Sequence, residues 1–176
     1  YEETDKETDG ILITGVQSSY MEMTEFKEIH ERVILVGVQQ AAGDDTEESV
    51  RELGDLAQTA GAQAVASVIQ KREKIHPATY IGKGKLDEVR ALLWETEATG
   101  IICDDELSPA QLNNLQSELD CKVMDRTLLI LDIFARHATS SEGKLQVELA
   151  QLRYRAARLA GLGSSLSRLG GGIGTR

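Results

Sequence analysis

The sequence predicts an α/β fold: a small parallel sheet of about four strands flanked by helices, followed by a long C-terminal helix. Short apolar runs rich in β-branched residues alternate with amphipathic segments of helix length, as in parallel sheets with crossover helices. Aromatic residues make up only 4% of the 176 residues, so the core must be built from aliphatic side chains. The last segment breaks the alternation, because its apolar residues recur at heptad spacing.

Residues 1–31 stand apart from this pattern. Residues 1–9 are acidic and rich in threonine, so we expect a partly disordered N-terminal extension over residues 1–31, with a short strand at Ile11–Val16. The chain begins with Tyr1 rather than methionine and ends at Arg176 inside a glycine-rich stretch. We therefore expect the chain to be a piece of a longer protein.

Residues 32–139 carry the alternation that defines the α/β domain. Arg32–Val38 reads RVILVGV, a continuous apolar run that is typical of a strand buried on both faces. Asp44, Asp45 and Thr46 are candidate N-caps, and Asp45 with Glu48 resembles a capping box, which predicts a helix that ends at Gly61. A second strand is expected at Ala64–Ile69.

The second half of this domain repeats the same alternation. Ser108 is expected to cap a helix, with Pro109 at its first position and Gln111 completing a capping box. The expected elements are an amphipathic helix closed by Gly100, a strand at Ile101–Cys103, a helix ending near Leu119, a strand at Lys122–Met124, and a helix that starts at Asp125 or Thr127 and runs through Phe134.

Residues 140–176 predict half of a coiled hairpin. Apolar residues recur four and three positions apart at Leu145, Leu149, Leu152, Ala156 and Leu159, which is the spacing of a narrow helix–helix seam. We expect a first helix and a glycine-rich loop, with the second helix beyond Arg176. Two alternatives stay open, namely packing of this helix on the α/β domain and dimerisation through the seam. We expect a monomer.

The charge distribution is asymmetric. The net charge is −10, which by itself argues against nucleic acid as a partner. From Lys144 to Arg176, however, six basic residues stand against a single acid, Glu148. This predicts an acidic body with a basic arm, unless the two parts differ by chance.

The cellular setting is predicted from what the sequence lacks. Cys103 and Cys121 do not make a disulfide framework, which fits a reducing cytoplasm. A run of about 18 apolar residues does not occur, so we expect no membrane span.

The sequence does not match the nucleotide-binding motifs of P-loop enzymes. Thr79 stands where a phosphate loop needs its first glycine, and Leu86 stands where it needs serine or threonine. A guanine-reading Asn-Lys-x-Asp motif does not occur either, so a P-loop nucleoside triphosphatase site is excluded. The three histidines are scattered, and we assign no catalytic residue.

The candidate metal ligands are three consecutive acidic residues, Asp104, Asp105 and Glu106. They follow a strand at the edge where parallel sheets bind ligands, which would suit Mg²⁺, but we favour a solvated acidic loop and assign no metal ligand. Asp125, Arg126 and Asp132 are interpreted as caps and surface pairs.

The run Gly82-Lys83-Gly84-Lys85 is a candidate nucleotide- or phosphate-binding site. Its glycines let backbone amides approach an anion, its lysines add positive charge, and it opens a helix whose N-terminus favours phosphate. The alternative is a flexible loop with solvated lysines.

The stretch from Gly170 to Arg176 has the most unusual composition and follows a basic helix. Exposed glycine amides and arginines suit contact with RNA, and Tyr154 is expected to point outward and stack on a base. A flexible linker is the alternative. The candidate RNA-binding residues are Arg153, Tyr154, Arg155, Arg158, Arg168, Gly171, Gly172, Gly174 and Arg176.

Several of these segments, in the same order, resemble the HflX family of translational GTPases. The resemblance extends from about Arg32 to Arg176 and is most specific at EGKLQVELAQL and GGIGTR. The segments that carry it are residues 76–85, 107–111, 123–134, 142–152 and 171–176.

The resemblance implies an N-terminal α/β domain, a two-helix hairpin and then a P-loop GTPase domain. It implies a large ribosomal subunit and its RNA as partners, with the hairpin loop reaching toward the peptidyl transferase centre, and a role in splitting or rescuing stalled ribosomes. This chain lacks the GTPase domain, and GTP and Mg²⁺ are expected to bind there. The GTPase domain is itself expected as a partner of this chain. No cofactor is expected within these 176 residues. ATP-dependent RNA remodelling at Gly82–Lys85 is the alternative.

Overall fold

The computed structural model describes residues 31–41 and 43–169, with side chains described as far as Arg158. The predicted strand at Ile11–Val16 and the rest of the expected extension up to residue 30 lie outside this part, as do residues 170–176. Within the described residues the fold is α/β, as predicted. Its elements are β1 (Glu31–Gln39), α1 (Thr46–Thr59), β2 (Ala62–Lys71), α2 (Lys83–Glu95), β3 (Gly100–Cys103), α3 (Pro109–Leu119), β4 (Lys122–Asp125), α4 (Arg126–His137) and α5 (Ser141–Leu169).

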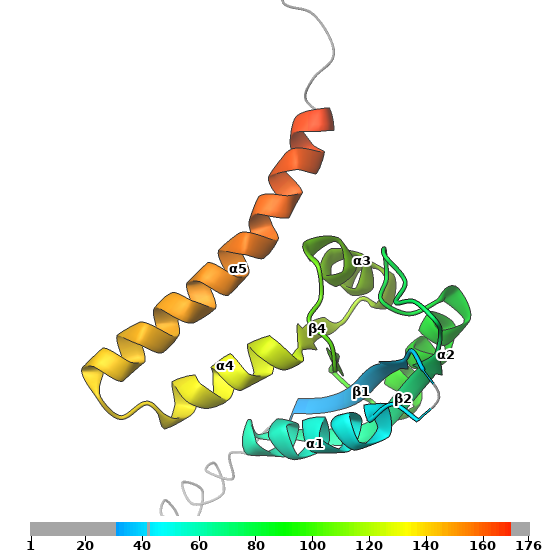
Figure 1. Cartoon of the computed structure of the whole chain (residues 1–176), viewed down its shortest axis with the longest axis horizontal. Coiled ribbons are helices and arrows are strands. Elements are labelled where there is room, and N and C mark those ends of the chain that lie inside the picture. Colours follow the sequence, from blue (N-terminus) through cyan, green and yellow to red (C-terminus); the bar gives the residue numbers. More distant parts are fainter. Residues whose placement is uncertain (1–30, 42, 170–176) are drawn as a thin grey trace, which may run out of the picture.

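The four strands form one parallel sheet with the order β2-β1-β3-β4. Helices α1 and α4 cover one face of the sheet, and α2 and α3 cover the other (Figure 1). The apolar run in β1 serves both faces, because Ile34 and Val36 belong to the core under α2 and α3, whereas Leu35 lies in the core with Leu53 and Leu129. A strand buried on both faces was therefore the correct prediction.

Helix capping confirms one prediction and corrects another. Ser108 and Gln111 form the predicted capping box at the start of α3. At α1, however, Asp45 makes no side-chain cap bond, and the predicted box is wrong. The cap comes instead from Asp44, whose carboxylate accepts from the Thr46 hydroxyl at 2.7 Å and from the Thr46 amide at 3.3 Å. These bonds, led by the Thr46 hydroxyl, lower the pKa of Asp44 to about 2.

Helix α5 stands out from the layered body. It leaves α4 at a sharp bend, passes α3 and continues beyond the sheet (Figure 1). With 29 residues it is far longer than the other helices, such as the 14-residue α1. Among the described residues no helix has the length and apolar character needed to cross a membrane.

Candidate functional site

The side of α5 that faces the body combines apolar and polar side chains. Val147, Gln151, Tyr154 and Arg158 recur four and three positions apart, and each is half-buried or buried. The leucine seam lies on another side of the helix, with Leu145, Leu149 and Leu152 exposed by 66%, 47% and 56%. The helix itself packs on the α/β domain against α3 and α4, as one of the alternatives expected, but the described seam leucines take no part in that contact.

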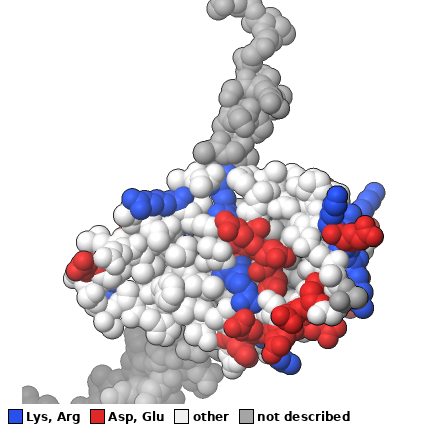
Figure 2. Space-filling view, viewed as in Figure 1, with Lys and Arg blue, Asp and Glu red and all other residues white. Residues whose placement is uncertain are grey.

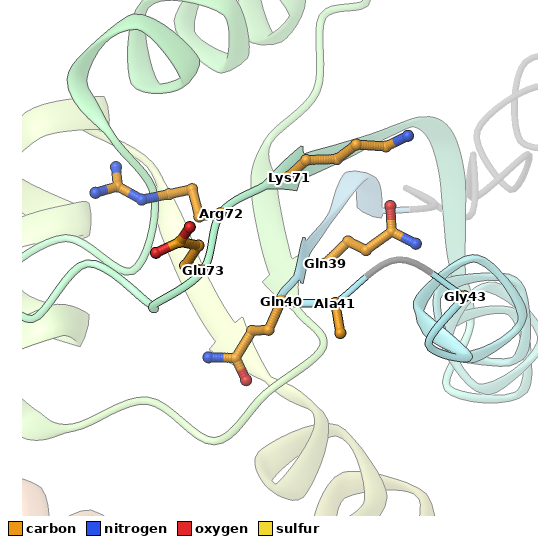
Figure 3. A pocket seen from close by; sticks show the side chains of 7 residues that line it. All are labelled: Gln39, Gln40, Ala41, Gly43, Lys71, Arg72 and Glu73. Atoms are coloured by element: carbon orange, nitrogen blue, oxygen red, sulfur yellow. The ribbon is translucent and has the colours of Figure 1, made fainter.

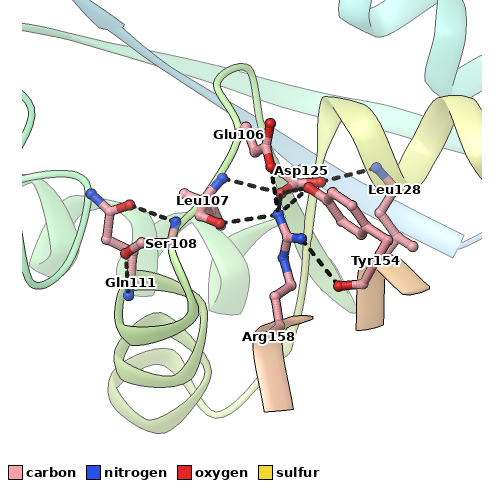
Figure 4. Close-up of polar contacts among 8 residues, drawn as sticks. All are labelled: Glu106, Leu107, Ser108, Gln111, Asp125, Leu128, Tyr154 and Arg158. Atoms are coloured by element: carbon pink, nitrogen blue, oxygen red, sulfur yellow. Dashed lines mark hydrogen bonds and ion pairs between the residues drawn. The ribbon is translucent and has the colours of Figure 1, made fainter. Parts of the chain in front are cut away.

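Hydrogen bonds and an ion pair attach α5 to the body at two points. Nearer the bend, the Gln151 amide donates to Asp132 on α4 at 2.8 Å. Farther along, the Arg158 guanidinium donates to the Asp125 carboxylate at 2.8 Å and to the Leu107 carbonyl at 3.0 Å (Figure 4). The Tyr154 hydroxyl donates to the same Asp125 oxygen. Direction-specific bonds thus act at both of these points.

Asp125 is the centre of this attachment. It ends β4, is only 2% exposed, and caps α4 by accepting from the Leu128 amide at 2.9 Å. Its other oxygen accepts from the Leu107 amide at 3.1 Å, in the loop between β3 and α3. The prediction that Asp125 caps a helix is confirmed, but it is buried and also holds α5. One carboxylate therefore connects α4, α5 and this loop.

Tyr154 is a neutral donor in this arrangement. Burial, followed by the hydrogen bond to Asp125, raises the pKa of its phenol above the usual value. The guanidinium of Arg158 lies over the Tyr154 ring, 3.3 Å from its centroid. The prediction that Tyr154 points outward to stack on a base is therefore wrong, because its hydroxyl is held by the body.

The candidate RNA-binding residues divide into three groups. Arg153 and Arg155 are exposed on α5, as an RNA contact requires. Arg158 is 9% exposed and is used inside the chain together with Tyr154. Arg168 belongs to α5 where side chains are not described, and the candidate glycines and Arg176 lie outside the described residues. The structure therefore brings only the first group to a described surface.

Of the acidic residues after β3, Asp104 and Asp105 are anchors rather than parts of a solvated loop, whereas Glu106 is exposed as expected. Asp104 pairs with Arg126 at 2.8 Å, and Asp105 accepts from the Tyr80 hydroxyl at 2.7 Å. Glu106 lies 3.5 Å from the Arg158 guanidinium. Each of the three carboxylates thus has a partner within the chain. Among the described residues, His, Cys, Asp and Glu form no group of three or more that suits a metal ion.

Arg126 is a structural residue, as interpreted from the sequence, but it makes more contacts than a surface pair would. Besides Asp104, it donates to the Ser49 carbonyl at 2.7 Å and pairs with Glu52 at 3.0 Å. It therefore connects the start of α4 to α1 and to the end of β3. The interpretation of Arg126 as a surface pair understated its role, because its side chain is only 23% exposed.

The run Gly82–Lys85 opens α2, as predicted, with Gly82 at the cap position. The Gly82 amide donates to the Gln70 side chain at 2.8 Å, and Lys85 pairs with Glu88 at 2.6 Å. A Cβ at Gly82 would lie 2.5 Å from the Arg72 guanidinium, whereas one at Gly84 would meet nothing within 4 Å. Two of the four candidate phosphate-binding positions are thus already used within the chain.

A shallow hollow of about 400 Å³ lies at the carboxyl ends of β1 and β2. Gln39, Gln40, Lys71 and Arg72 line it, and Figure 3 shows Lys71 and Arg72 pointing to opposite sides of the chain. Because the two cations diverge, they do not form a focused anion site.

The body presents an acidic surface. Helix α1 carries exposed Glu47, Glu48, Glu52 and Asp55, and Figure 2 shows acidic side chains gathered on one part of this face. RNA phosphates would be repelled there, so an RNA partner has to approach another side of the molecule.

The fold and this attachment define a class of protein: an α/β accessory domain that carries a long, partly basic helical arm and lacks a phosphate loop of its own. Residues 47–135 match the family model described as GTP-binding GTPase N-terminal, and residues 137–176 match the one described as GTP-binding GTPase Middle Region. The chain belongs to the HflX GTPase family.

Individual relatives agree with this assignment. The chain is 66% identical over 155 residues to the GTPase HflX of Lacrimispora saccharolytica, which covers 88% of this chain and 37% of that protein. It is 42% identical over 146 residues to the GTPase HflX of Escherichia coli, covering 83% of this chain and 34% of that protein. The chain thus spans little more than a third of these relatives.

Solved structures show the same architecture. A GTP-binding protein from the archaeon Sulfolobus solfataricus, in complex with GDP, superposes with a TM-score of 0.58 at 27% identity, covering 76% of this chain and 40% of that one. The structure titled SsGBP and GDP complex gives a TM-score of 0.60 at 28% identity, covering 78% and 39%.

Proposed function

We propose that this chain is the N-terminal ribosome-binding region of an HflX-type GTPase, which associates with the large ribosomal subunit and helps to split or rescue stalled ribosomes. The observation that carries the proposal is the geometry of α5, which exposes Arg153 and Arg155 between its two attachment points and then continues beyond the body. Phosphate contacts by such side chains position a protein on RNA without reading its sequence. Family membership supports the same partner.

The mechanism is steric. The α/β body holds α5 along one side, and the opposite, exposed side of the arm, which carries Arg153 and Arg155, contacts ribosomal RNA. The acidic surface of α1 favours one orientation, with α1 turned away from the RNA. Arg168 and the glycines near Arg176 belong to the proposed contact.

The exposed leucines have a role in the same proposal. Leu145, Leu149 and Leu152 face away from the body at heptad spacing, as expected for a seam that receives one further helix. We assign that place to the returning helix of a hairpin in the full-length protein. GTP and Mg²⁺ would bind in the GTPase domain that follows it, and the nucleotide state there would set ribosome affinity.

The alternative, ATP-dependent RNA remodelling at Gly82–Lys85, has weaker support. The Gly82 amide and the Lys85 ammonium already have partners in Gln70 and Glu88. Lys71 and Arg72, which line the nearby hollow, diverge.

Co-sedimentation with purified large ribosomal subunits tests the proposal. We expect saturable binding by the chain, and about tenfold weaker binding by the double variant Arg153→Gln/Arg155→Gln, because two phosphate contacts are lost. The matched control is Arg51→Gln, which removes an exposed arginine from the acidic α1 and should bind like the wild type. Equal binding by all three proteins would exclude α5 as the contact.

A further inference from the structure

The attachment of the arm includes a buried ion pair. Arg158 is 9% exposed and Asp125 is 2% exposed, so their ion pair is withdrawn from water. The desolvation of a buried ion pair offsets much of its attraction, so it adds little net stability, but its directional bonds favour one arrangement over others.

We infer that Asp125 is a positioning residue, whose carboxylate sets the direction of α5 relative to the α/β body and couples that direction to the loop between β3 and α3. On the arm side, it receives the Tyr154 hydroxyl and the Arg158 guanidinium. On the loop side, it receives the Leu107 amide, and Arg158 in turn donates to the Leu107 carbonyl. The loop backbone is thus held by both members of the ion pair.

The coupling follows from this sharing of partners. If α5 turned away, Arg158 would leave the Asp125 carboxylate and the Leu107 carbonyl at the same time. Glu106, 3.5 Å from the guanidinium, would lose the same partner. The inference concerns the direction of the arm in the free chain and does not depend on what the arm binds.

Pulsed electron paramagnetic resonance can measure the direction of the arm. Spin labels are placed at two exposed positions, Gln58→Cys on α1 and Ala156→Cys on α5. Cys121, which is half-buried, is replaced by serine, and the buried Cys103 is kept. The width of the label–label distance distribution then reports how firmly α5 is held.

Three variants separate the ion pair from general mobility of the helix. Arg158→Met keeps the length of the side chain but removes the guanidinium, and Tyr154→Phe removes only the hydroxyl. Arg153→Met is the matched control, because Arg153 lies on the same helix but is exposed. We expect Arg158→Met to at least double the width of the distribution, Tyr154→Phe to widen it less, and the control to leave it unchanged.

Hydrogen exchange at Leu107 measures the coupling to the loop. Arg158→Met should speed exchange of the Leu107 amide at least tenfold, whereas Arg153→Met should not change it. An unchanged distance distribution, or equal widening in Arg158→Met and the control, would overturn the inference. If Arg158→Met unfolds the chain, as shown by loss of helical circular dichroism, Tyr154→Phe takes its place in the test. A distance distribution no wider in Tyr154→Phe than in the Arg153→Met control would then overturn the inference.

Discussion

Gly84→Ala should stabilise the chain, although Gly84 lies in the run that resembles a phosphate-binding loop. Gly84 is the second residue of α2, and a Cβ there would meet nothing within 4 Å. Replacing glycine by alanine at a helical position free of clashes gains roughly 0.5–1 kcal/mol, because the unfolded chain loses less backbone entropy on folding. We therefore expect the free energy of unfolding to rise by about that amount.

Gly100→Ala is the matched contrast, because there the structure leaves no room. A Cβ at Gly100 would lie 2.6 Å from the backbone oxygen of Lys122 on the neighbouring strand, and a backbone atom cannot move aside cheaply. We expect Gly100→Ala to lower the free energy of unfolding by about 1–3 kcal/mol, as for other overpacked sites.

Urea unfolding followed by circular dichroism measures both changes, with equal m-values required for the comparison. Destabilisation by Gly84→Ala would refute the reasoning, because it would show that the space around Gly84 is filled. If Gly84→Ala is stabilised but binds ribosomal subunits more weakly, glycine is kept at this position for close approach of a partner rather than for folding.

Three further predictions follow from side-chain contacts. Arg126→Met should lower the free energy of unfolding by about 1–3 kcal/mol, because it leaves the partly buried Asp104 unpaired, whereas Arg51→Met should change it by less than about 0.5 kcal/mol in the same urea titration. The pKa of Asp44 is depressed from 3.8 to about 2, so the contribution of its carboxylate to folding stability is present above pH 4 and is lost as pH falls through 2. The difference in thermal midpoint between the wild type and Asp44→Ala should therefore shrink over that range. A constant difference would contradict the assignment. Equilibrium dialysis should detect no saturable ATP binding, and binding that Lys83→Gln abolishes would establish the alternative site.

The sequence predicted most of the fold because its signals are local. The apolar run in β1 and the spacing of Ser108, Pro109 and Gln111 depend on neighbours within a few residues, and both were confirmed. At the start of α1 the predicted capping box was wrong, although Asp44, whose carboxylate accepts from Thr46 there, was among the candidate caps. The carboxylate of Asp44 also receives the amides of Gln40 and Ala41, and this turn geometry has no sequence signature.

The attachment of α5 could not be predicted in the same way. Its body-facing side has heptad spacing, like the leucine seam, but Gln151, Tyr154 and Arg158 are polar and resemble a solvated side of a helix. Their partners are distant in sequence, since Asp125 precedes Arg158 by 33 residues. The basic residues of the arm were therefore counted together, although Arg158 serves the fold and Arg153 faces solvent.

The salt dependence of binding to large ribosomal subunits tests the central claim most directly. Each phosphate contact contributes roughly one unit to the slope of log K against log salt concentration. We predict a steep negative slope for the wild-type chain and a slope shallower by roughly two units for Arg153→Gln/Arg155→Gln. Identical slopes for the two proteins, or binding that does not respond to salt, would contradict the assignment of α5 as the RNA-binding arm.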